Sequence, residues 1–263
     1  MRGTAWTRLT VAAMSALALA GCGQPQNAKP VTASLPKVQA PATTPEPQPS
    51  VPTPAPAPPP LVDPALPLTA PAVPIPLTFV APTVGIDAPV LAVGRTASGA
   101  MDAPEGPASS PLWHDTFWYR GGSEPGQLGT TTIAGHVDDV LGRPGAFWNV
   151  RDLRVGDVVE LDDARDGAKA RYRITDAAVY SYAQANSPDL LMRLYGEAAY
   201  NGDPGQRNLA SDAMSRISII TCTGVFHRGS SFGYDHRFIA FGVLIPDDTP
   251  GARIPASDVR LPF

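Results

Sequence analysis

Three short runs of the sequence place reactive side chains where strands end. Residues 132–138 read Thr-Ile-Ala-Gly-His-Val-Asp, and residues 218–224 read Ser-Ile-Ile-Thr-Cys-Thr-Gly. Both are apolar, β-branched runs of the kind that form buried strands, and they bring His136 and Cys222 to strand ends. A thiol and an imidazole are the minimum groups for covalent acyl transfer. Arg237 directly precedes a third apolar run, so a cation could join the thiol and the imidazole.

The elements that must position these groups are mostly strands. Short β-branched or alternating runs separated by Gly and Pro turns predict strands and a closed β-barrel with a few short helices. The expected strands cover residues 77–80, 82–90, 129–137, 158–161, 169–182, 216–221 and 238–245. Residues 113–119 fit a helical turn or an edge strand, and residues 97–110 fit a loop.

Two helical segments are also expected. Residues 147–153 have an amphipathic pattern that turns Phe147, Val150 and Leu153 inward. A second helix should run from Ser187 or Pro188 to about Tyr200, with Ser187 as the N-cap residue. Its apolar face would consist of Leu190, Leu191, Leu194 and Tyr195. A loop rich in Gly, Asp and Asn follows, over residues 201–211.

Proline divides the chain into two parts of different character. Most of the 31 prolines lie before residue 83, and residues 23–76 contain no aromatic side chain. Such a segment buries too little apolar surface to fold, so we expect a disordered linker that favours the polyproline II conformation, followed by a domain over residues 77–263. The net charge of −4 and the absence of a basic block argue against a nucleic-acid partner.

The N-terminus has the composition of an export signal. Two arginines precede an apolar stretch, residues 9–20, that is short for a bilayer span. The stretch ends in Leu-Ala-Gly-Cys, which resembles a bacterial lipobox with Cys22 as the lipidated residue. Residues 1–22 would then be a lipoprotein signal peptide, and the protein would be exported and anchored to the outer face of the membrane. A plain cleaved signal peptide, and a disulfide between Cys22 and Cys222, are the alternatives.

The motifs around the three reactive residues resemble those of sortases. The matching stretches are residues 118–126 with 129–138, which lead to His136, then Thr221 with Cys222, the strand after Arg237, and residues 153–157. The similarity is greatest to the class F and E sortases of high-GC Gram-positive bacteria, and it covers residues 77–263. It implies the eight-stranded sortase barrel. The long connection over residues 183–214 departs from the family pattern and leaves the substrate motif open.

The resemblance also implies a role for each residue of the site. Cys222 would be the nucleophile, His136 the general acid and base, and Arg237 the group that stabilises the oxyanion. Two residues come between Tyr234 and Arg237, which differs from the class F pattern, so Arg228 is the fallback candidate. Asp138 would orient His136, and Thr221 would shape the substrate groove. Taken alone, each of these residues also fits a structural or surface position.

The implied activity is that of a cysteine transpeptidase. It would cut an LPxTG-like sorting signal between Thr and Gly and pass the acyl group to an amine of a peptidoglycan precursor or a pilin, attaching proteins to the cell wall or to pili. We expect a monomer with no cofactor. We expect no metal either, because His114, His227 and His236 match no zinc spacing.

Two other functions are compatible with parts of the sequence. Papain-like peptidases place the cysteine before the histidine, the reverse of the order here, and the Ser-His-Gly and Cys signature of L,D-transpeptidases is not found. A wall-associated lipoprotein with an inactive, sortase-like barrel that binds a partner is the remaining alternative. A Cys222 thiol that reacts with a peptidyl electrophile would distinguish an enzyme from such a binding protein.

Overall fold

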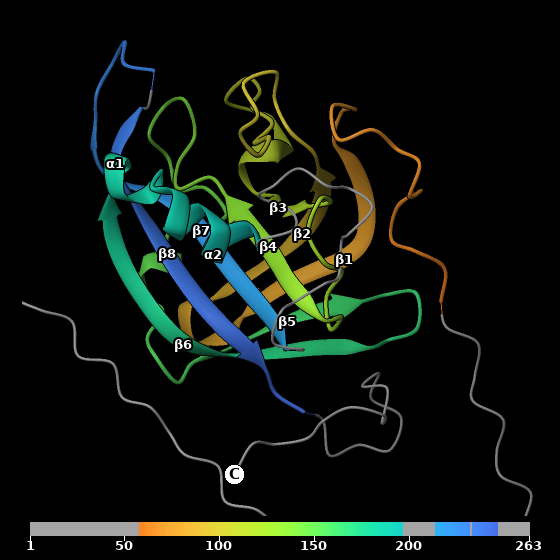
Figure 1. Ribbon diagram of the computed structural model, residues 1–263. Coiled ribbons are helices and arrows are strands. Elements are labelled where there is room, and N and C mark those ends of the chain that lie inside the picture. The colour runs from red at the N-terminus through yellow and green to blue at the C-terminus, as the bar shows by residue number, and fades with distance from the viewer. Residues whose placement is uncertain (1–57, 197–213, 232, 247–263) are drawn as a thin grey trace, which may run out of the picture. The chain divides into compact units, whose positions relative to one another are not determined.

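The chain divides into two compact units, Met1–Pro54 and Ala55–Phe263. The computed structural model describes residues 58–196, 214–231 and 233–246 (Figure 1). The expected signal peptide with Cys22, most of the expected linker, the loop at residues 201–211 and the C-terminal residues from 247 lie outside the described residues. The fold is therefore that of the second unit.

Eight strands form a closed barrel in the order β1-β2-β3-β4-β7-β8-β6-β5. This confirms the predicted fold class, a mostly β protein with few and short helices. The strands are β1 (Val73–Ala81), β2 (Ile86–Val93), β3 (Thr116–Tyr119), β4 (Gly129–Gly135), β5 (Val158–Asp163), β6 (Lys169–Ser181), β7 (Ser215–Phe226) and β8 (Tyr234–Leu244). The helices are the 3-10 turns η1 (Pro82–Val84), η2 (Pro111–Trp113) and η3 (Val150–Asp152), and the α-helices α1 (Tyr182–Ala185) and α2 (Pro188–Tyr195). Within the described residues, no helix has the length and apolar content to cross a membrane.

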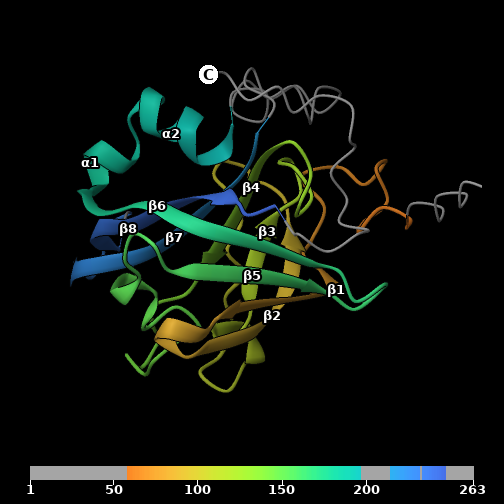
Figure 2. The same ribbon diagram turned by 90° about the horizontal axis from the view of Figure 1, so that it is seen from below.

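The alternation of side chains along the strands gives the barrel wall two apolar faces. Inward residues such as Ile133, Ile219 and Phe238 join the main core. Their neighbours Ile220 and Ile239 point outward, where they pack with α1 and α2 in a second cluster. Figure 2 shows these two helices on the outside of the wall formed by β6, β7 and β8. The helices α1 and α2 therefore cover part of the outer face of this wall.

The segment after β4 confirms part of the sequence prediction. Phe147, Val150 and Leu153 are completely buried, and the Phe147 ring packs on Phe79 with 5.3 Å between centroids. Their inward orientation is as predicted, but only Val150–Asp152 forms a helical turn, of the 3-10 type. An apolar spacing of three residues suits a 3-10 turn as well as an α-helix, so the pattern alone did not separate the two.

Several predicted element boundaries were wrong. Pro82–Val84 forms η1 rather than part of a strand, since proline supplies no donor to a ladder. The predicted helix at 187–200 ends at Tyr195, because Gly196 adopts φ +80°. The short helix α1 was not predicted, although Ser181 and Gln184 form a capping box there. Residues 113–119 supply both η2 and β3, and β3 lies between β2 and β4 rather than at an edge.

The predicted domain start at residue 77 also falls inside β1, which begins at Val73. The chain before β1 is held by Arg120, whose side chain is 2% exposed. Its guanidinium donates hydrogen bonds to backbone carbonyls before β1, with distances of 3.0 Å to Pro71 and 2.8 Å to Pro67. A buried guanidinium needs several acceptors, and this proline-rich segment supplies them as backbone carbonyls. The folded domain therefore includes residues that composition alone assigns to the linker.

Candidate active site

Cys222 and Arg237 are cross-strand neighbours. The antiparallel pair of β7 and β8 places them directly opposite each other, so both side chains project from the same face of the sheet. This is the outer face, because Ile220 and Ile239, two residues away on each strand, pack against α1 and α2. The register of one hairpin therefore brings the thiol and the cation together.

The Arg237 guanidinium is held from two sides. Its Nη1 donates to the carbonyls of Tyr234 at 2.7 Å and of His236 at 2.9 Å. Its Cζ lies 5.1 Å from the ring centroid of Tyr182, the first residue of α1. Both the hairpin and the helix thus fix the direction of the charge. Arg228, the alternative cation, is exposed in the turn between β7 and β8, so the register favours Arg237 as the partner of Cys222.

His136 reaches the same level of the barrel from the neighbouring strand. Strands β4 and β7 are parallel, with Ala134 opposite Ile220, and two more residues on each strand lead to His136 and Cys222. The imidazole packs on Trp113, with 4.7 Å between centroids, and on Phe117, with 5.2 Å. Its Nε2 lies 3.0 Å from the carbonyl oxygen of Pro104. His136 therefore follows β4 at the level where β7 carries Cys222 and β8 carries Arg237.

Gly135 is required immediately before His136. A Cβ at this position would lie 2.6 Å from the Phe147 ring, closer than real Cβ contacts occur. The backbone nitrogen of Phe147 in turn donates to the His136 carbonyl at 2.9 Å. The Ala-Gly-His sequence thus allows the core ring to pack under the end of β4.

The two predicted supporting residues have well-defined partners. The Thr221 hydroxyl is buried and donates to the Gly135 carbonyl at 2.8 Å, which ties β7 to the end of β4. The Asp138 carboxylate accepts a short hydrogen bond from the Tyr234 hydroxyl. In the described part of the chain, the hydrogen bond of the His136 ring goes to Pro104 rather than to Asp138. Asp138 therefore connects the loop after β4 to the start of β8.

The electrostatics around Cys222 favour the neutral thiol. Burial raises the pKa of Cys222; the Arg237 charge opposes this rise, and the negative charges of Asp138 and Glu105 add to it. Burial, followed by the hydrogen bond to Asp138, also raises the pKa of Tyr234. The phenol therefore stays protonated and donates to the carboxylate. The thiol is therefore the favoured form at neutral pH, and a nearby base that accepts its proton would generate the reactive thiolate.

Asp235 links the two strands of the hairpin that carries Cys222. Its Oδ1 accepts from the Val225 nitrogen at 2.8 Å and from His236 Nδ1 at 2.7 Å, and its Oδ2 lies 3.2 Å from His227 Nε2. The hydrogen bond from His236, ahead of that from Val225, lowers the pKa of Asp235. Gly224 has φ +90°, and a Cβ there would lie 2.2 Å from Asp235 Oδ1. His227 and His236, two of the histidines considered as metal ligands, therefore contact the Asp235 carboxylate.

Among the residues that the structure describes, no group of three or more His, Cys, Asp or Glu side chains is arranged to hold a metal ion.

One wall beside the site is formed by α2. The Thr132 hydroxyl on β4 donates to the Leu194 carbonyl at 2.8 Å, and the Ser218 hydroxyl on β7 lies 3.5 Å from the Arg193 carbonyl. These hydroxyls satisfy carbonyls that the end of a helix leaves without partners. The last turn of α2 is thus held on the outer face of the two strands that lead to His136 and Cys222.

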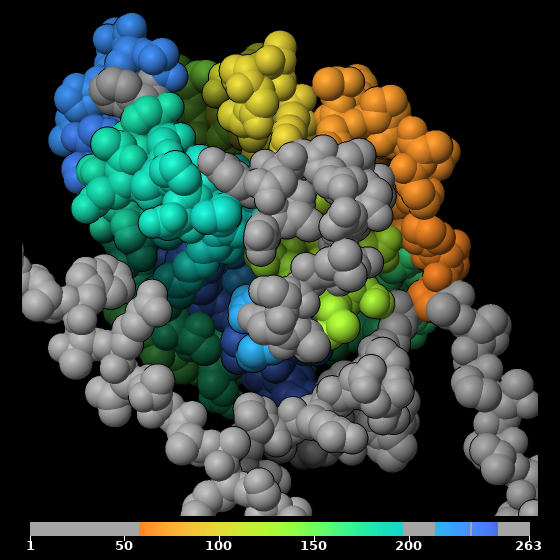
Figure 3. All heavy atoms as spheres, viewed as in Figure 1, coloured from red at the N-terminus to blue at the C-terminus, as the bar shows by residue number. Residues whose placement is uncertain are grey.

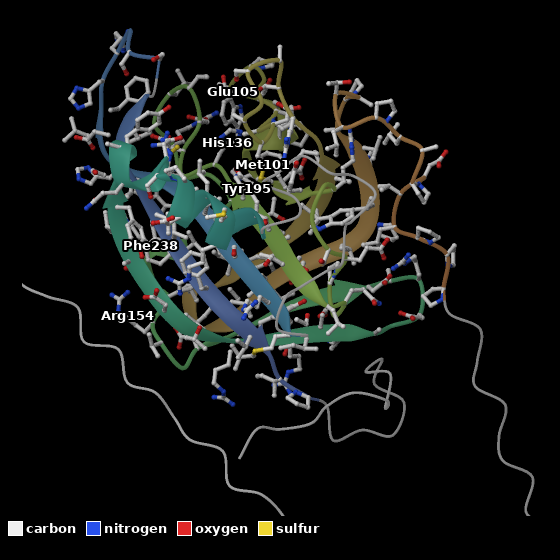
Figure 4. All side chains as sticks on the ribbon, viewed as in Figure 1. Met101, Glu105, His136, Arg154, Tyr195 and Phe238 are labelled. Carbon is white, nitrogen blue, oxygen red and sulfur yellow. The ribbon has the colours of Figure 1, made fainter. Side chains whose placement is uncertain are left out.

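The loop over residues 94–110, which includes the loop expected at residues 97–110, also lies beside the site. Figure 4 shows Met101 and Glu105 of this loop at the same end of the barrel as His136 and Tyr195. In the space-filling view, this loop (yellow) and the α1–α2 segment (teal) form neighbouring parts of one face (Figure 3). The loop has no apolar period, and it contacts His136 through the backbone carbonyl of Pro104, so no local pattern predicts this contact.

Comparison with known proteins identifies the family. The Sortase domain family matches residues 80–245, more than half of the chain. Similar solved structures include the lid mutant of sortase A from Corynebacterium diphtheriae, with 17% identity and a TM-score of 0.43 over 69% of this chain and 75% of that one. Sortase C1 from Streptococcus agalactiae in complex with MTSET has 20% identity and a TM-score of 0.42, over 65% of this chain and 69% of that one. A Clostridium perfringens sortase D5 transpeptidase has 19% identity and a TM-score of 0.39, over 65% of this chain and 78% of that one. No curated protein sequence matches.

The chain therefore belongs to the sortase family, whose members are cysteine transpeptidases.

Proposed function

We propose that the protein is an active sortase of the class F or E type, with Cys222 as nucleophile, His136 as general acid and base, and Arg237 as the oxyanion-stabilising group. The observation that carries the proposal is the register that sets Cys222 opposite Arg237 on adjacent strands, with His136 following the parallel partner strand. These are the three group types that acyl transfer through a thioester needs.

The proposed reaction has two halves. Cys222 transfers its proton to His136, and the thiolate attacks the scissile carbonyl of an LPxTG-like signal, between Thr and Gly. The C–N bond breaks as His136 returns the proton to the leaving amine, and the acyl group stays on sulfur as a thioester. An acceptor amine, from a peptidoglycan precursor or a pilin lysine, then attacks the thioester and loses a proton to His136. The C–S bond breaks, and the Cys222 sulfur regains its proton.

The protein mass before and after incubation with peptides tests this proposal. The full chain and its Cys222→Ala variant are incubated with LPxTG, LAxTG and scrambled peptides. We expect a mass gain for the wild type alone, with one motif, and we expect His136→Ala and Arg237→Ala to lose turnover while remaining folded. Absence of any adduct from folded protein with a free thiol would favour the alternative, a catalytically inactive, wall-associated binding lipoprotein.

We further propose that the enzyme acts outside the cell, attached to the membrane through a lipidated Cys22. The support is the apolar stretch that ends in Leu19-Ala20-Gly21-Cys22. Acyl chains on one cysteine are sufficient for stable anchoring, because each buried methylene contributes about 0.8 kcal/mol. A Cys22→Ser variant should be released into the medium, which fractionation and immunoblotting would measure. Unchanged retention in the membrane fraction would contradict the anchor.

A further inference from the structure

The loop over residues 94–110 is held near both ends by hydrogen bonds to neighbouring segments. At its start, Arg95 donates a short hydrogen bond to the Tyr119 hydroxyl. Near its end, the Pro107 carbonyl accepts from Trp113 Nε1 at 2.9 Å, and the Ala108 carbonyl accepts a short bond from Arg143. Between these points, the Asp102 nitrogen donates to the Gly94 carbonyl at 3.0 Å. The carbonyl of Pro104 therefore has a fixed position relative to His136.

The hydrogen bond between His136 and Pro104 defines where the imidazole carries its proton. The two atoms, Nε2 and the carbonyl oxygen, are 3.0 Å apart. A carbonyl oxygen can only accept, so the proton of this bond belongs to Nε2. In the neutral ring, Nδ1 is then unprotonated, and the structure gives it no hydrogen-bond partner among the described residues.

The aromatic rings beside His136 restrict rotation of its imidazole ring. Trp113 and Phe117 contact the imidazole with centroid distances of 4.7 and 5.2 Å. A half-turn of the ring about its Cβ–Cγ bond would exchange Nε2 for a carbon and leave the Pro104 carbonyl without its donor. The ring orientation and the tautomer therefore support each other.

We propose that the Pro104 backbone carbonyl is a positioning group that holds His136 as the Nε2–H tautomer, so that Nδ1 performs every proton transfer. This inference rests on the proposed function. Nδ1 takes the proton from the Cys222 sulfur, gives it to the amine that leaves when the peptide C–N bond breaks, and takes one from the acceptor amine. Throughout, Nε2–H remains bonded to Pro104, so both N–H groups of the imidazolium have a role.

The tautomer is measured directly by nitrogen NMR of the full chain labelled with ¹⁵N-histidine, without substrate, at a pH where the rings are neutral. The chain has four histidines, and His136→Asn identifies the signal of interest. We expect an Nε2–H proton that exchanges with water more slowly than that of the exposed His114. An Nδ1–H tautomer, or exchange as fast as that of His114, would overturn the proposal.

A matched pair of loop variants then connects the tautomer to the chemistry. Pro104→Gly frees the backbone that presents the carbonyl, and Ser109→Gly adds the same flexibility at an exposed residue of the same loop. We expect Pro104→Gly to lose the slow Nε2–H and to form the peptide adduct about tenfold more slowly, part of the range that general acid–base catalysis contributes. Ser109→Gly should keep both wild-type values.

The outcomes separate the two proposals. Equal loss of rate in both glycine variants, or an unchanged rate in Pro104→Gly, would overturn the positioning role while leaving the sortase activity intact. If the wild type forms no adduct, the proposed function fails and the proton route fails with it, whichever tautomer NMR reports.

Discussion

Cys222 lies among three charges whose effects on the thiol differ in sign. Arg237 favours the thiolate, whereas Asp138 and Glu105 oppose it, and burial opposes it most strongly. A thiol that stays protonated at rest is protected from chance oxidation and alkylation, because the thiolate is the reactive form. In the proposed mechanism, the reactive thiolate forms when His136 accepts the proton of the Cys222 thiol.

The charge balance predicts opposite effects of two substitutions on the thiol. Asp138→Asn removes a negative charge that raises the pKa of Cys222, so the pKa should fall. Arg237→Gln removes the cation that lowers it, so the pKa should rise. The pH dependence of Cys222 alkylation by iodoacetamide, followed by peptide mass, measures both.

The control is Asp87→Asn, an exposed carboxylate on β2, which is not adjacent to β7 or β8 in the barrel. It should leave the alkylation midpoint unchanged. Shifts of the same sign in the two site variants would show that general loosening, rather than charge, determines the reactivity of the thiol.

At the scale of elements, the site depends on how β4 ends. The strand must stop, turn and present His136 while the Phe147 ring fills the core beneath it. Gly135 makes this possible because it has no Cβ, and Thr221 completes the junction by donating to the Gly135 carbonyl. The position of the imidazole is therefore determined by core packing as much as by the strand register.

Gly135→Ala should disturb the core and the site together. The added methyl group would lie 2.6 Å from the Phe147 ring, and overpacking of this kind costs about 1–3 kcal/mol. Urea denaturation and the rate of adduct formation should both show the loss. A Gly135→Ala/Phe147→Leu double variant should lose less stability than the sum of the losses in the two single variants, because the smaller side chain relieves the overlap. Strict additivity would contradict direct contact as the cause.

The elements also show what can be predicted from this sequence. The strands of His136 and Cys222 were predictable because β-branched runs are long and bounded by Gly, and the inward face of Phe147, Val150 and Leu153 follows from spacing alone. The Pro104 carbonyl and the Tyr234–Asp138 hydrogen bond were not. They join residues 32 and 96 positions apart, one through a backbone atom, and no local pattern encodes such contacts.

At the scale of the whole barrel, the proline-rich segment before β1 becomes part of the folded domain. Leu61 is 8% exposed within the main core, and its backbone nitrogen donates to Glu124 Oε1 at 3.0 Å. The Arg120 guanidinium takes most of its acceptors from this segment. A composition that excludes an independent core still allows a segment to supply carbonyl oxygens and single apolar side chains to one.

A chain that starts at residue 77, the boundary that composition suggests, should therefore be markedly less stable than the full chain. It would lose the burial of Leu61, about 1.5–3 kcal/mol for one fully buried apolar side chain, and the pairing of Val73 with Ala92 at the start of β1. Arg120 would keep only its 3.5 Å contact to the Ala92 carbonyl from this set of acceptors. We expect the free energy of unfolding to fall by about 3 kcal/mol or more, since a charged donor left without partners adds its own cost.

Urea denaturation of the full chain, of a chain starting at residue 58 and of one starting at residue 77 measures this loss of stability. The intermediate chain separates the contribution of residues 58–76 from that of the residues before them. Equal stability of the two shortened chains would show that the contacts of Arg120 and Leu61 do not stabilise the barrel.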